Sequence, residues 1–159
     1  AIDRLSFSLP WPANSYRFEL MENKTSRLWV AEQVSDGHPV RIVAMIVVWQ
    51  IVDEAHIATI AVHPEYRRQG IGKHLLAFAL NDSLQRGMRT ATLEVRAGNR
   101  VAQAMYRQFG FETTGVRLHY YQDNLEDALI MTVKLSDLAG WVRTAENIMS
   151  LQKEADRES

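Results

Sequence analysis

The sequence predicts one α/β domain, with a central mixed, mostly antiparallel twisted sheet and helices on both faces. Two observations predict it: runs of β-branched and aromatic residues joined by turn residues fill the first half, and helical apolar periods alternate with short strands in the second. With 159 residues, 47% hydrophobic and 23% charged, the chain is long enough for one domain with a sizeable core.

The first half reads as a short helix followed by three strands. Pro12 in a favoured first-turn position predicts a helix over 12–21. Apolar runs rich in β-branched and aromatic residues then predict strands at 28–34, 41–52 and 55–62. Turn-forming residues at 35–39 separate the first two of these strands, so we expect a hairpin.

The second half alternates helices and strands. Leucines and alanines recur at the helical period over 72–86, and Gly87 is suited to end that helix. A strand at 90–95 and a short helix from the Asn99 cap to Phe109, ended by Gly110, come next. Closing strands are predicted at 111–114 and 127–135, around a polar loop at 122–124.

From Ser136 the pattern changes to an amphipathic helix, so we divide the chain into a domain at 1–135 and a C-terminal helix and tail at 136–159. Apolar residues from Leu138 to Met149 fall on one helical stripe. This stripe either covers the domain's own core or forms a homodimer contact, and both interpretations stay open.

Composition argues against several functional classes. A net charge of −1 gives no bulk attraction for nucleic acid or an anionic membrane, and no apolar run approaches the roughly 20 residues of a membrane-spanning helix. The absence of cysteine excludes a disulfide framework and is compatible with the cytoplasm, where we expect the protein to be. The five histidines lack metal-ligand spacing, so no metal is predicted.

The most informative segment is a strand that passes through a glycine turn into a helix, Ile60 to Lys73. The start of a helix presents backbone N–H groups without internal partners and the positive end of the helix dipole, both suited to a pyrophosphate. Gly70 and Gly72 let the backbone approach the ligand closely, and Arg67, Arg68 and Lys73 add positive charge. The spacing fits neither the Walker pattern nor the dinucleotide fingerprint.

Arg67-x-x-Gly70-x-Gly72 after a strand resembles the pyrophosphate motif of the GNAT superfamily of acetyltransferases. Segments 93–99 and 126–131, Tyr106 and Tyr120-Tyr121 look similar to the RimI-like branch, the ribosomal-protein-alanine N-acetyltransferases. The resemblance covers roughly residues 9–135. The family's opening strand has no counterpart at the start of this chain, and the helix after residue 136 is additional, so we expect an N-terminally incomplete GNAT fold with an extra helix.

The resemblance implies a set of functional residues. Glu94 would be the general base and Tyr106 the general acid. The acetyl-CoA contacts it implies are at Ile60, Ala61, Val62, Arg68, Gln69, Gly70, Ile71, Gly72, Lys73 and Asn99.

The chemistry of these residue types agrees with the implied roles. A carboxylate near a strand end can take a proton from an attacking amine, and a phenol can donate one to a departing thiolate. A solvated glutamate and a core tyrosine are the plain structural interpretations of the same two residues.

The sequence therefore predicts transfer of an acetyl group from acetyl-CoA to the N-terminal α-amine of a protein, with an alanine of a ribosomal protein as the expected acceptor. Trp11, Tyr120 and Tyr121 are the candidate residues for binding the peptide. A GNAT enzyme acting on a small-molecule amine or a lysine side chain is the alternative within enzymes. A non-catalytic acyl-CoA-binding interaction module is the alternative outside them.

Overall fold

A computed structural model of the chain describes residues 24–138. These residues form six strands, two α-helices and two short 3₁₀ helices. In chain order they are β1 (Ser26–Gln33), β2 (Arg41–Ile51), β3 (Glu54–Val62), η1 (Pro64–Tyr66), α3 (Ile71–Gln85), β4 (Thr90–Arg96), α4 (Arg100–Gln108), β5 (Glu112–Arg117), β6 (Ala128–Lys134) and η2 (Leu135–Leu138). The predicted order of elements over this range is confirmed.

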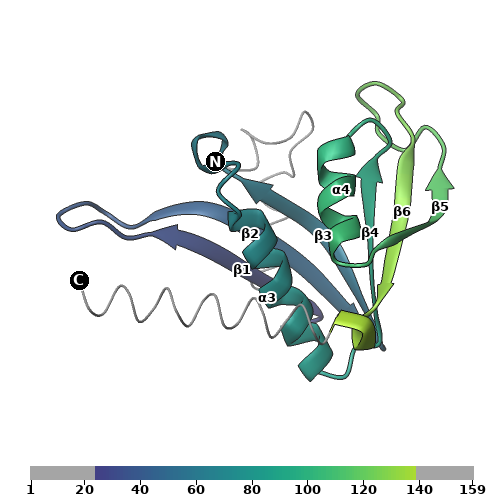
Figure 1. Cartoon of the computed structure of the whole chain (residues 1–159), viewed down its shortest axis with the longest axis horizontal. Helices are drawn as coiled ribbons and strands as arrows, with labels where there is room; N and C mark the ends of the chain where they lie inside the picture. The colour runs from purple at the N-terminus through teal and green to yellow at the C-terminus, as the bar shows by residue number, and fades with distance from the viewer. Residues whose placement is uncertain (1–23, 139–159) are drawn as a thin grey trace.

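The strands form one mixed sheet in the order β1-β2-β3-β4-β6-β5. Neighbouring strands run antiparallel except β3 and β4, which run parallel. A parallel neighbour needs a crossover connection, and α3 provides it. Figure 1 shows β3 and β4 close together where they start and diverging toward their ends, with α4 beside the divergence. The predicted mixed, mostly antiparallel sheet is confirmed.

The turn between β2 and β3 differs from its sequence-based prediction, which carried the strand through Val52. Val52 instead lies in a tight turn with a φ of 56°. A β-branched residue is strained in this left-handed region, and no glycine or asparagine marks the position. The apolar pattern therefore predicted a strand one residue too long.

Both described helices pack against the same face of the sheet. Leu76 and Leu80 of α3 and Tyr106 of α4 share one buried cluster with Leu93 and Val95 of β4. Side chains alternate along a strand, so Glu94 lies on the other face. The helix predicted at 12–21 lies outside the described residues.

The described part of the chain ends in η2, where Leu138 is 2% exposed and belongs to the buried cluster against α3. Leu138 was predicted to begin the apolar stripe of a C-terminal helix. The remainder of that helix and the homodimer contact predicted for it lie outside the described residues. No helix between residues 24 and 138 is long and apolar enough to cross a membrane.

Candidate active site

The candidate site lies where β3 and β4 separate. Their parallel pairing ends at Ile57 and Leu93, although β3 continues to Val62 and β4 to Arg96. The N–H of His63 bonds to the Val43 carbonyl on β2, and alternation then directs the N–H and C=O of Ile60 away from β2. The backbone of Ile60 thus faces the side on which β4 has diverged.

The predicted phosphate-binding turn leads from β3 through η1 to the start of α3. Gly70 is the N-cap of α3, with a φ of 78°, and no side chain caps the helix there. The first backbone bond of the helix runs from the N–H of His74 to the Gly70 carbonyl, so Ile71, Gly72 and Lys73 precede it. Their N–H groups form the array that an anion at a helix start would contact.

The first arginine of the motif acts on the turn itself. The Arg67 Nε donates to the Val62 carbonyl at 3.0 Å, which joins the turn to the end of β3. Arg68 takes a φ of 62°, an uncommon backbone state for a residue with a side chain. A Cβ on Gly72 would meet the Val62 Cγ2 at 3.2 Å, so α3 approaches β3 as closely as glycine allows.

Asn99 caps α4 as predicted, since its side-chain oxygen accepts from the N–H of Ala102 at 3.1 Å. Gly98, just before it, donates its N–H to a Glu126 oxygen at 2.6 Å. This bond is the largest of the influences that lower the pKa of Glu126. The start of α4 is therefore fixed to the β5–β6 loop.

Glu94 is the first residue of β4 beyond the last β3–β4 pair, and both of its oxygens have partners. The His56 Nε2 contacts Oε2 at 2.6 Å, and the Arg117 Nε contacts Oε1 at 3.3 Å. The carboxylate side chain is only 14% exposed. Its pKa is lowered, chiefly by the hydrogen bond with His56, which acts against burial. Glu94 is therefore ionised at neutral pH.

His56 and Arg117 were not predicted as site residues. His56 pairs with Trp49 of β2 on one side and with Thr92 of β4 on the other, which places it on the Glu94 face. Its ring also packs on Trp49, with centroids 5.4 Å apart. The only local signal is that the alternation of β3 turns His56 away from the α3 face; its position beside Glu94 depends on strand pairing.

Tyr120 and Tyr121, the residues predicted to bind the peptide, lie near Arg117. Their rings meet edge to face with centroids 5.2 Å apart, and the Arg117 guanidinium lies 5.8 Å from the Tyr120 centroid. The Arg96 guanidinium covers Tyr121 at 3.9 Å. Burial raises the pKa of Tyr121 to about 12, with Glu94 among the smaller contributors. Trp11, the third residue predicted to bind the peptide, lies outside the described residues.

Tyr106 comes from the opposite face of the sheet. It is 6% exposed and packs against Phe111, with ring centroids 5.9 Å apart. Burial raises the pKa of its phenol above the usual range, and Tyr121 raises it further. The phenol therefore keeps its proton at neutral pH. Tyr121 is thus an electrostatic neighbour of both Tyr106 and Glu94.

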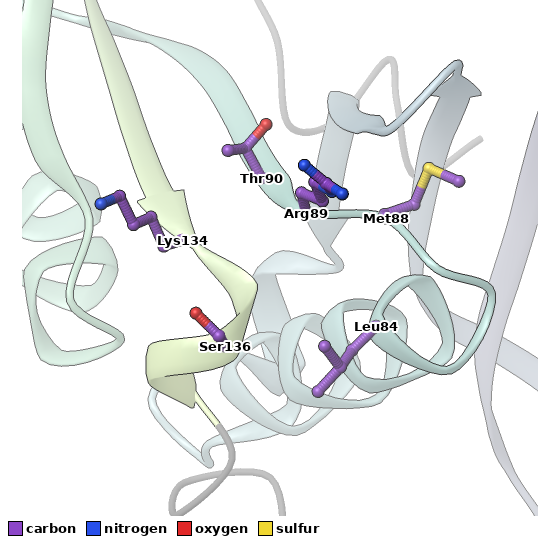
Figure 2. Close-up of a pocket in the computed structure, with 6 residues that line it drawn as sticks. All are labelled: Leu84, Met88, Arg89, Thr90, Lys134 and Ser136. Carbon is purple, nitrogen blue, oxygen red and sulfur yellow. The ribbon is translucent and has the colours of Figure 1, made fainter.

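A separate pocket lies at the other end of β4, where Figure 2 shows Arg89, Thr90 and Lys134 around it together with Leu84, Met88 and Ser136. Thr90 pairs with Glu54 at the start of the β3–β4 ladder, whereas Glu94 follows the ladder's end. The pocket is therefore not part of the candidate active site. Within residues 24–138, no three His, Cys, Asp or Glu side chains come together as a metal site.

The sequence profile of the acetyltransferase (GNAT) family matches residues 2–111. The chain belongs to this family. A curated relative from Bacillus subtilis, described as a putative ribosomal protein bS18-alanine N-acetyltransferase, is 39% identical to this GNAT chain over 86% of it and 87% of the relative.

Solved structures agree with the sequence comparison. The ribosomal-protein-S18-alanine N-acetyltransferase of Escherichia coli superposes with a TM-score of 0.73 at 31% identity, over 84% of this chain and 83% of that one. A structure of the NatC complex bound to Gag peptide and CoA gives a TM-score of 0.72 at 25% identity, covering 84% of this chain and 85% of that chain.

These findings confirm the predicted family, its GNAT fold and the similarity to the RimI-like branch. The chain is an acetyl-CoA-dependent N-acetyltransferase. The roles of individual residues remain predictions.

Proposed function

We propose that the chain acetylates the N-terminal α-amine of a protein, with alanine as the first residue and a ribosomal protein as the natural acceptor. The observation that carries the proposal is the position of Glu94, an ionised carboxylate at the point where β3 and β4 separate. The relatives described as ribosomal protein alanine N-acetyltransferases support the choice of acceptor.

We assign the acetyl-CoA pyrophosphate to the start of α3, where the N–H groups of 71–73 have no helical partner. The Arg68 and Lys73 side chains add positive charge, and Gln69 completes the turn. The backbone of Ile60, which faces away from β2, suits an amide group of the pantetheine arm, since that group hydrogen-bonds as a strand does. Ala61 and Val62, which follow it on β3, belong to the proposed cofactor set with it. Asn99, at the start of α4, completes the proposed cofactor set.

Glu94 is the proposed acceptor of the amine proton, directly or through one water. An α-ammonium group that reaches Oε1 gives up one proton to Glu94, and the freed nitrogen lone pair forms the C–N bond as the C–S bond breaks. The second proton of the nitrogen leaves to solvent as the amide forms. A carboxylate with a lowered pKa is a weak base but an available one. An α-amine has an ordinary pKa of about 7.7 to 8.0, so little basicity is required near neutral pH.

Tyr106 is the proposed proton donor to the departing sulfur. Its raised pKa keeps the phenol protonated, and it approaches from the face opposite Glu94. In this arrangement the base and the acid act on opposite sides of the reacting carbonyl without competing for the same space. Holding the amine and the thioester in line contributes more to the rate than proton transfer does, since good orientation lowers a barrier by roughly 7–11 kcal/mol.

The charge at the site also favours an α-amine over lysine. A lysine amine, with an ordinary pKa of about 10.4, costs roughly 3 kcal/mol more to deprotonate near neutral pH. A carboxylate with a lowered pKa contributes less toward that cost than a stronger base would. Acetylation of a small-molecule amine or of lysine is the alternative that the experiment must separate.

Four peptides of matched sequence test the acceptor. One has a free Ala terminus, one a free Leu terminus, one a blocked terminus with an internal lysine, and one is the blocked peptide without lysine. Mass spectrometry after reaction with acetyl-CoA locates the acetyl group. We expect the Ala peptide to react faster than the Leu peptide. Two further peptides with Ser or Gly termini should react more slowly than the Ala peptide, because one methylene changes discrimination by only about 1–3 kcal/mol.

Fastest acetylation of the blocked lysine peptide would overturn the acceptor assignment and leave the family unchanged. Spermidine is included in the same assay as a small-molecule amine, and its fastest acetylation would favour the small-molecule alternative. Binding of CoA without transfer to any of the peptides or to spermidine would support the non-catalytic alternative. A free Leu terminus reacting as fast as Ala would remove the small-residue specificity.

A further inference from the structure

We propose that His56 is a positioning residue that acts through Glu94: its Nε2–H holds one carboxylate oxygen so that the other faces the acceptor amine. The inference rests on the proposed role of Glu94 as base. It adds a residue that the family motif and the acceptor prediction did not include.

The geometry fixes the direction of the bond. The His56 Nε2 and the Glu94 Oε2 are 2.6 Å apart, and an ionised carboxylate only accepts hydrogen bonds. The imidazole nitrogen therefore carries the proton and donates it. A bond from a ring nitrogen to a carboxylate at this length belongs to the strong, charge-assisted class.

The histidine is itself held in place. Its ring packs against Trp49, with the two ring centroids 5.4 Å apart, and its side chain is 23% exposed. Strand β3 positions it through the pairs that His56 makes with Trp49 and Thr92. The donor is therefore fixed by the last paired part of the sheet, immediately before the strands separate.

The second carboxylate oxygen has a weaker partner. The Arg117 Nε lies 3.3 Å from Oε1, and the arginine side chain is 53% exposed at the edge of β5. An arriving ammonium group can replace this contact, whereas the 2.6 Å bond on the opposite oxygen is the one retained. The two Glu94 oxygens therefore have different roles: Oε2 is held by His56, and Oε1 receives the acceptor amine.

The same contact controls ionisation. The hydrogen bond from His56 is the largest of the influences that lower the pKa of Glu94, ahead of the opposing effect of burial and the smaller effects of Arg117. Tyr121, from the loop between β5 and β6, is the other titratable group within electrostatic reach of Glu94 that the described contacts identify. Without the His56 donor, the effect of burial is opposed only by the smaller effects of Arg117, so the pKa of the Glu94 carboxyl rises.

Two substitutions separate the donor from the ring. His56→Gln retains an N–H donor at the Nε2 position, and His56→Phe retains a ring against Trp49 without a donor. His38→Gln, in the exposed hairpin turn, is the control for loss of a histidine. The full chain is assayed with the free Ala peptide between about pH 5 and 8, and the acetyl-CoA concentration is varied to give both kcat and KM. The pKa of Glu94 is measured separately by carbon NMR of its carboxyl group in the free protein.

We expect His56→Gln to retain most of the wild-type kcat. His56→Phe should lose about tenfold or more, part of the roughly 10²–10⁴-fold that a general base contributes, with KM for acetyl-CoA unchanged. The ratio of wild-type to His56→Phe kcat should grow as pH falls. The reason is that the pKa of Glu94 rises without the donor, so the variant loses its base at a higher pH than the wild type does.

A His56→Phe variant with wild-type kcat would overturn the inference, and so would equal losses in both variants or a kcat ratio that does not change with pH. An unchanged Glu94 pKa in His56→Phe would overturn it as well. The NMR result needs no acceptor, so it still tests the His56–Glu94 coupling if the peptide assignment fails.

Discussion

Glu94 and Tyr106 belong to opposite faces of one sheet. Leu93 and Val95, on either side of Glu94, share the buried cluster that contains Tyr106, so alternation directs the carboxylate to the other face. The two faces meet where β3 and β4 diverge. An amine approaching from one face and a thioester held between the strands would therefore have a base and an acid on different sides.

The first prediction concerns turnover by the base. Glu94→Gln should lower kcat by about 10²–10⁴-fold and leave the affinity for acetyl-CoA near the wild-type value, because the amide keeps the shape but cannot take a proton. Initial rates with the Ala peptide and calorimetric titration with CoA measure the two quantities. A variant with wild-type kcat would remove Glu94 from the mechanism.

The second prediction concerns stability in acid. The folded-state pKa of Glu94 is lowered from its ordinary value of 4.5, so its stabilising contribution is complete above that value and is lost as pH falls through the folded pKa. The free energy of unfolding of the wild type should therefore decrease more steeply below about pH 4.5 than that of Glu94→Gln. Urea unfolding of both proteins at several pH values measures the difference; parallel curves would contradict it.

The third prediction concerns the acid. Tyr106→Phe should lower kcat more than it changes the affinity for acetyl-CoA, and the loss should be pH-independent up to about pH 10, since the pKa of the phenol is raised above its usual range. Thermal unfolding of the Tyr106→Phe protein checks that the variant is folded. A folded variant with full turnover would leave Tyr106 as a core residue.

The fourth prediction uses two glycines with the same backbone state. Gly70 and Gly37 have φ values of 78° and 75°, and a Cβ would meet nothing closer than 3.8 Å at Gly70 and nothing within 4 Å at Gly37. Substitution by alanine should cost each protein about 1–2 kcal/mol of stability. Only Gly70→Ala should weaken binding of CoA, as measured by calorimetry. Equal affinities in the two variants would remove the turn from the cofactor site.

Features set by neighbouring residues could be predicted from the sequence. The Asn99 cap, the left-handed Gly87 and the limits of α3, which were predicted to within one residue, all depend on contacts within a few residues. The family resemblance then identified Glu94 and Tyr106 as candidates without showing what surrounds them.

Features set by distant residues could not be predicted. The contact of His56 with Glu94 joins positions 38 residues apart, and it depends on which strands are neighbours and in which register. The same is true of Arg117, whose partner is on a strand that is not its neighbour in the sheet. A single sequence contains no direct signal for such pairs.

The short parallel ladder has a consequence for how the domain holds together. In the described sheet, Glu54–Ile57 and Thr90–Leu93 provide the backbone pairing between the β1–β3 half and the β4–β6 half. A ligand that hydrogen-bonds to both diverging strand edges would extend the contact between the two halves of the sheet. Separation of the halves by local unfolding would then cost more free energy. Acetyl-CoA would then be a structural part as well as a reactant. Amide hydrogen exchange near residues 57–62 would slow when acetyl-CoA binds. The two halves of the sheet would therefore resist separation most in the complex that is ready to react.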